Sequence, residues 1–152
     1  MATTTPSRRI ETPAGIDPRG PQVAAAITSV VLVAVLLLAP GPASVVLLAA
    51  QALVFAIGAT RGVQDTPYSW AFRTLLRPRL SPPAELEDPT PPRFAQAVGL
   101  GFALVGLAGF VLGADLVGQV AVGFALVAAL LNAVFRFCLG CEMYLLYRRI
   151  GG

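Results

Sequence analysis

The residues of this sequence that could do chemistry are its only two cysteines, Cys138 and Cys141. Cys-x-x-Cys is the spacing that allows a reversible intramolecular disulfide. Two charged side chains flank the pair. Arg136 would favour a thiolate and Glu142 would oppose it, because opposite charges stabilise the ionised sulfur and like charges do not. The pattern makes Cys138 and Cys141 candidate redox thiols, with Arg136 and Glu142 as their electrostatic neighbours.

If one helix continues through this stretch, the two thiols project from the same side on neighbouring turns. Their Cα atoms would then be about 5–6 Å apart, which is inside the disulfide range. The pair would lie near the C-terminal end of that helix, whose dipole would oppose a thiolate. Arg136 and Glu142 are too far apart on one helix to pair, so we expect Glu142 to meet an arginine of residues 61–93.

Three interpretations of the cysteines are open. The first is thiol–disulfide exchange with a redox partner, and the second is a metal site. Two thiolates supply half of a tetrahedral zinc shell, and the sequence has no histidine to complete it, so Cys138 and Cys141 would bind metal only if a dimer supplied four thiolates. The third is that the two cysteines are unreactive and only pack at a helix end.

No phosphate loop, nucleophile elbow or His-Glu-x-x-His is present in the sequence. We therefore assign no firm catalytic residue, no cofactor and no firm metal site, which favours a protein that is not an enzyme.

The composition predicts the environment of these thiols. The chain is 56% hydrophobic and only 12% charged, whereas soluble domains carry about 25% charged residues. Four apolar segments, at about 21–39, 43–60, 94–112 and 116–136, are each long enough to cross a hydrocarbon layer of roughly 30 Å as a helix. They lack the period-2 alternation of strands. The expected fold is therefore an all-α membrane protein with four transmembrane helices.

The charges predict the topology. All eleven basic residues are arginines, and none lies in the short turns 40–42 and 113–115. They lie instead in the N-terminal tail, in residues 61–93 and at the C-terminal end. The positive-inside bias then predicts two hairpins in a bacterial plasma membrane, with both termini cytoplasmic. The lipid bilayer is the expected partner. Nucleic acid is not expected, although the net charge is +3, because no basic stripe interleaves with stacking aromatic residues.

The segments outside the spans differ in character. Residues 1–20 are expected to form a flexible cytoplasmic tail, ahead of a single membrane domain over 21–149. Thr66 followed by Pro67 is typical of a helix start, so residues 67–77 are expected to form a short interfacial helix with aromatic anchors. The proline-rich residues 78–92 are expected to form an extended strap between the hairpins. Asp17-Pro18 and Asp88-Pro89 precede the first and third spans, which indicates a tandem repeat of a two-helix unit.

The chain also resembles a bacterial, actinobacterial-type integral-membrane family known only as a domain of unknown function. The resemblance covers roughly residues 16–149. It rests on the Asp-Pro-Arg-Gly-Pro opening at 17–21, on residues 77–83, 87–89 and 93–96, and on Phe-Cys-Leu-Gly-Cys-Glu at 137–142. The resemblance implies the class and the topology of the protein and implies no activity.

Two functions from different classes follow. The first is an accessory thiol-redox or sulfur-handling membrane protein that uses the Cys-x-x-Cys pair at the cytoplasmic edge, with a thiol-redox protein as its partner. The alternative is a non-catalytic structural or scaffold subunit of a larger membrane complex, in which glycine-rich helices and the proline strap would be contact surfaces. A homo-oligomer is compatible with both.

Overall fold

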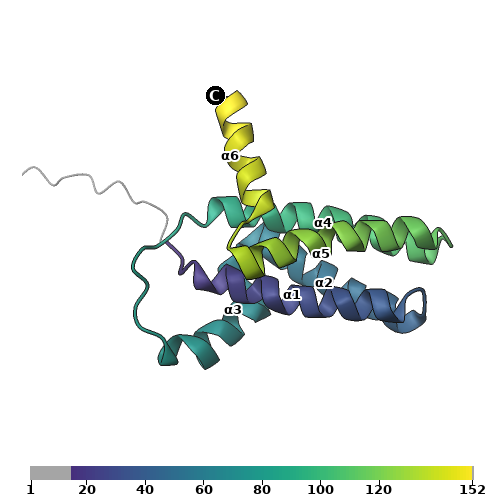
Figure 1. The fold of residues 1–152 in the computed structure, drawn as a ribbon, viewed down its shortest axis with the longest axis horizontal. Coiled ribbons are helices and arrows are strands. Elements are labelled where there is room, and N and C mark those ends of the chain that lie inside the picture. Colours follow the sequence, from purple (N-terminus) through teal and green to yellow (C-terminus); the bar gives the residue numbers. More distant parts are fainter. Residues whose placement is uncertain (1–14, 152) are drawn as a thin grey trace, which may run out of the picture.

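The computed structural model describes residues 15–151, which fold as helices; most connections are short, and the longest is the non-helical stretch 80–89 (Figure 1). Residues 1–14, which make up most of the expected tail, lie outside the described residues. Four helices are long and apolar enough to cross a membrane: α1 (Arg19–Leu38), α2 (Pro42–Arg61), α4 (Thr90–Val111) and α5 (Asp115–Phe135). The expectation of an all-α protein with four apolar spans is confirmed. The sidedness of the spans stays a prediction.

Elementary turn chemistry sets the ends of the spans. Pro42 starts α2 at a position where its missing N–H costs nothing. Gly113 has a φ of 80° in the turn between α4 and α5, a conformation that glycine adopts readily. The observed bounds of the spans lie within a few residues of the expected ones. The largest difference is at α4, which begins four residues earlier than expected. Asp88 Oδ1 accepts a hydrogen bond from the Thr90 amide, which stabilises this earlier start.

The four spans form one bundle with a small core. The most extensive contacts are between α2 and α4, α1 and α5, and α4 and α5. Leu32, Val35, Leu48 and Val122 are fully buried at the centre. Many large apolar side chains face outward, among them Leu37 and Leu112, each 80% exposed. Water would not tolerate so much exposed apolar surface, whereas lipid tails solvate it.

The start of each two-helix unit has the same structure. Asp17 Oδ1 accepts from the Arg19 amide just as Asp88 Oδ1 accepts from the Thr90 amide. The residues before the two aspartates, Ile16 and Glu87, exchange two backbone hydrogen bonds of 2.9 Å in an antiparallel bridge. Ile16 and Glu87 occupy equivalent positions, because each directly precedes the aspartate of its own unit. A contact between equivalent residues is what a pseudo-two-fold axis between the two units would produce.

A second symmetric contact lies at the bundle end. Gln22 on α1 donates to the carbonyl of Ala133 near the end of α5, at 2.9 Å. Arg93 on α4, at the aligned position, donates to the carbonyl of Ala59 near the end of α2, at 2.7 Å. Each side chain therefore satisfies carbonyls that a helix end leaves without partners. These contacts fit the expected tandem repeat.

Each of the two expected units is followed by a further helical element. After α2 and a 3-10 turn η1 (Val63–Asp65), the chain forms α3 (Pro67–Ala71), a π-helical turn η2 (Phe72–Leu76) and a 3-10 turn η3 (Arg77–Arg79). After α5 it forms α6 (Leu139–Gly151). α3 contacts α1, and α6 contacts the corresponding helix α4. Both elements leave the same end of the bundle on opposite sides (Figure 1). Each unit is thus two spans followed by a short helical arm.

Two expectations need correction here. The fourth span does not continue through the cysteines, because α5 ends at Phe135 and Arg136 is left-handed with a φ of 55°. The Phe137 amide bonds back to the Leu131 carbonyl and closes the helix end. Residues 15–20 are not part of a flexible tail, since Ile16 is held in the bridge and Asp17 is buried.

Candidate functional site

The cysteine pair forms the N-terminal turn of α6. Cys138 precedes the first residue of the helix, and its carbonyl accepts the Glu142 amide at 3.0 Å. Its Sγ accepts the Cys141 amide at 3.2 Å, which is the contact that an N-cap side chain makes. The expectation that a helix C-terminus would oppose a thiolate is therefore wrong. A helix N-terminus lowers the pKa of a cysteine that sits on it.

Cys138 and Cys141 are joined by a disulfide, with their Cα atoms 5.1 Å apart. Both residues are partly exposed. The i, i+3 spacing therefore brings the sulfurs together as expected, although on a different helix from the one expected.

Gly140, between the cysteines, seats α6 against α4. A Cβ at Gly140 would lie 2.6 Å from the Cβ and 2.7 Å from the Cα of Ala95, which is closer than side chains approach. Phe94 and Tyr144 pack beside this contact with their ring centroids 5.6 Å apart. The position of the disulfide is therefore fixed by a close approach that only glycine permits.

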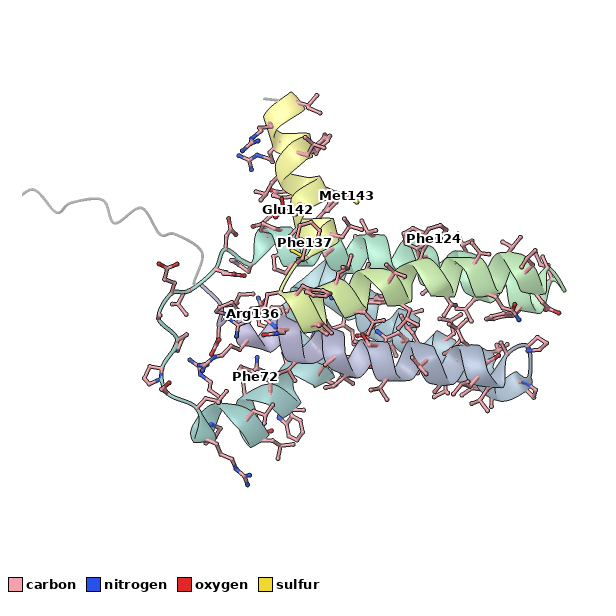
Figure 2. All side chains as sticks on the ribbon, in the orientation of Figure 1. Phe72, Phe124, Arg136, Phe137, Glu142 and Met143 are labelled. Atoms are coloured by element: carbon pink, nitrogen blue, oxygen red, sulfur yellow. A yellow bond between two sulfur atoms is a disulfide. The ribbon has the colours of Figure 1, made fainter. Side chains whose placement is uncertain are left out.

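The two charged neighbours of the thiols lie apart from each other. Arg136 lies at the end of α5, while Phe137, Glu142 and Met143 surround the foot of α6 (Figure 2). Both charged side chains are exposed. Over residues 15–151 the one ion pair joins Arg19 to Asp17, so the expected contact between Glu142 and an arginine of residues 61–93 is not made.

A cavity of about 660 Å³ lies beside the disulfide, and sequence reasoning missed it. Helices α1, α2, α4, α5 and α6 contribute to its lining, which includes both cysteines, Gly140, Arg136 and Glu142. Its lining includes Phe124, which Figure 2 labels on α5. Most of the lining residues are apolar, and five are charged. Their only signal in the sequence was a set of uncharged polar residues within apolar spans, namely Gln22, Gln96 and Asn132.

The first unit carries hydroxyls where the second carries thiols. Thr66 precedes α3, and its Oγ1 accepts the Ser69 amide at 3.3 Å, as Cys138 Sγ accepts the Cys141 amide. The two hydroxyls are 3.2 Å apart and buried. Thr-x-x-Ser therefore caps a helix at the position that Cys-x-x-Cys occupies in the second unit, and it has no redox chemistry.

Two ionisable groups near the bundle end have shifted pKa values. The hydrogen bond from the Arg19 side chain lowers the pKa of the Asp17 carboxyl below 3.8. Burial raises the pKa of Tyr68, whose hydroxyl donates to Gln51 Oε1 at 2.7 Å. Asp17 thus stays ionised at neutral pH and Tyr68 stays protonated. No group of three potential metal ligands lies together in residues 15–151.

Comparison with known proteins gives a family. No curated protein and no solved structure matches the chain. The model of one family, described as Domain of unknown function (DUF4395), matches residues 16–149. This match runs from the symmetric bridge at Ile16 through both helical units to the arm that carries the disulfide. The chain therefore belongs to the DUF4395 family.

Proposed function

We propose that this protein is a membrane-bound thiol–disulfide exchange protein with Cys138 and Cys141 as its redox pair. The observation that carries the proposal is the position of Cys138, whose sulfur accepts a backbone amide at a helix N-terminus while bonded to Cys141. That position stabilises a thiolate, which is both the nucleophile and the better leaving group in disulfide exchange.

The exchange balances with a dithiol partner. A thiolate of the partner attacks Cys138 Sγ, the disulfide breaks, and Cys141 leaves as a thiolate that takes a proton. The second thiolate of the partner then attacks the partner's own sulfur, so Cys138 leaves as a thiolate held by the amide of residue 141. Two electrons pass from the partner to the pair, and the partner leaves as a disulfide.

The arm itself supports a location at the membrane surface. α6 carries an exposed apolar stripe along one side, formed by Leu139, Met143, Leu146 and Ile150. Its last turn carries Arg148 and Arg149. An amphipathic helix of this kind lies in the interface with its apolar side in lipid. The arginine distribution supports the cytoplasmic side of a bacterial plasma membrane.

The test is trapping of the mixed disulfide in native membranes. With Cys141→Ser, the lone Cys138 thiolate attacks the disulfide of an oxidised partner, and one partner sulfur leaves as a thiolate. No resolving thiol remains to break the mixed disulfide, so we expect a partner protein to be captured and to be released by reductant. Cys138→Ser, at the matched position, should capture little, because Cys141 lies one turn inside the helix.

The redox state of the wild-type pair gives the independent readout. Alkylation followed by mass spectrometry should show both thiols changing together between reducing and oxidising growth. If both stay in one state under all conditions, while a double Cys→Ser variant keeps its stable membrane partners, the chain is a scaffold subunit and the redox proposal is wrong.

A further inference from the structure

The cavity beside the disulfide has the character of a ligand site. Its volume of about 660 Å³ is within the roughly 300–1,000 Å³ of small-molecule pockets. Such pockets have mainly apolar walls with a few polar groups that fix orientation. Here Phe102 and Phe124 belong to the apolar part. Gln96, Asn132 and Arg136 are among the polar groups, with Arg19, Gln22, Glu87, Asp88 and Glu142 also in the lining.

The depth of the cavity points to a ligand that is dissolved in lipid. Along α5 it extends from Asn132 to Phe124, which is about 12 Å at roughly 1.5 Å per residue. It therefore begins at the end of the bundle and enters the part of the spans that faces hydrocarbon. The charged lining residues, Arg19, Glu87, Asp88, Arg136 and Glu142, belong to segments at the end of the bundle. A small charged metabolite that entered as far as Phe102 and Phe124 would lose its hydration without gaining a charged partner there.

The polar groups suit carbonyl oxygens. Within residues 15–151 the side-chain amides of Gln96 and Asn132 make no hydrogen bond to protein. Both can donate to a ligand. Arg136 can donate as well, and its charge would stabilise an oxyanion formed beside it. A lipid acyl chain has nothing to accept these donors, whereas a flat ring with two carbonyls and an apolar tail uses both the walls and the amides.

We propose that the cavity binds an isoprenoid quinone, which oxidises the reduced Cys138–Cys141 pair. This inference rests on the proposed function, since it names where the electrons go after exchange. The Cys138 thiolate adds to a ring carbon of the quinone, and the electron pair moves to a ring oxygen, which takes a proton. The Cys141 thiolate then attacks Cys138 Sγ, the carbon–sulfur bond breaks, and the second ring oxygen takes a proton. The products are the disulfide and a quinol.

The experiment uses the full chain in lipid vesicles. The protein is reduced, freed of reductant and mixed anaerobically with a short-chain benzoquinone or naphthoquinone. Absorbance measures quinol, and mass spectrometry measures the loss of two hydrogen atoms from the protein and distinguishes it from a quinone adduct. We expect one quinol per disulfide. Diamide, a water-soluble oxidant that does not need the cavity, gives the reference rate.

Two variants on one helix separate the cavity from the thiols. Ala129 lines the cavity, so Ala129→Phe should slow oxidation by the quinone by about tenfold or more, because the added ring occupies the ligand's space. Val127 is 55% exposed on the same helix outside the cavity, so Val127→Phe should react as the wild type. Both variants should react with diamide at the wild-type rate.

A milder variant covers the case in which Ala129→Phe does not fold. Asn132→Leu removes one donor and should raise the KM for the quinone by about two- to tenfold. The quinone inference is overturned if diamide oxidises the pair but quinone yields no quinol, or if both cavity variants react with quinone as Val127→Phe does. If no oxidant or partner changes the thiols reversibly, the proposed function itself fails.

Discussion

Replacing Gly140 with alanine should detach the arm that carries the disulfide. The new Cβ would lie 2.6 Å from the Cβ of Ala95, where 3.4 Å is an ordinary contact, so α6 must move about 0.8 Å away from α4 or Ala95 must yield. Overpacking of this kind costs about 1–3 kcal/mol. Alanine is more favourable than glycine in a helix by up to about 1 kcal/mol, which offsets part of this cost. The net destabilisation of the docked arm is therefore about 1 kcal/mol, or roughly fivefold in its opening equilibrium.

Hydrogen exchange measured by mass spectrometry reports the opening of α6 separately from the opening of the other helices. Amides of residues 139–151 should exchange roughly fivefold faster in Gly140→Ala, while those of α1 and α2 keep their rates. Gly151→Ala is the control on the same helix, because nothing lies within 4 Å of the Cβ it would add. If the arm in Gly140→Ala exchanges as slowly as in the control, the contact with Ala95 does not hold α6 in place and the reasoning is refuted.

Three further outcomes follow from the packing and the charges. Gly109→Val should lower the melting temperature in detergent strongly and Gly101→Val little, because a Cβ at Gly109 would meet backbone of α5 at 2.6 Å and one at Gly101 meets nothing within 4 Å; equal losses would contradict this. Asp17→Asn keeps the capping oxygen but removes the charge, so it should destabilise at pH 7. Because the pKa of Asp17 is lowered in the folded state, the stability due to its charge is present above pH 3.8 and is lost as the pH falls below that value. The difference in melting temperature between the wild type and Asp17→Asn should therefore shrink at low pH. Thr66→Cys with Ser69→Cys, in a chain whose natural cysteines are serines, should form a disulfide under oxidant, shown by mass spectrometry, because these hydroxyls lie 3.2 Å apart; a persistently reduced pair would argue against the equivalence of the two arms.

The spans could be predicted from the sequence because hydropathy and length alone determine them. A run of about 20 apolar residues needs no knowledge of its neighbours to be recognised. Pro42 and Gly113 mark the turns by local backbone chemistry, and Asp17 and Asp88 mark helix starts. All of these features depend on residues that are close together in the chain.

The end of α5 could not be predicted in the same way. Arg136 takes a left-handed conformation that glycine or asparagine usually signals, and neither stands there. Apolar residues continue on both sides of it, so the pattern reads as one helix. What decides the break is a long-range contact, the seating of Gly140 on Ala95, which brings α6 across α4. The cavity was missed for the same reason, since residues of α1, α2, α4, α5 and α6, which are far apart in the sequence, line it.

A comparison of the two arms shows what distinguishes the one that carries the thiols. When Thr66 is aligned with Cys138, Tyr68 aligns with Gly140. Tyr68 extends from its arm to Gln51 within the bundle, so the first unit fills its arm position with a large side chain. Gly140 has no side chain and packs closely on Ala95, and both residues line the cavity. The second arm thus differs from the first in two ways: thiols stand where the first arm has hydroxyls, and a glycine at a close helix contact stands where the first arm has a tyrosine. The hydroxyls of the first arm already cap its helix, so capping alone does not account for thiols in the second arm, whereas the proposed redox pair needs them.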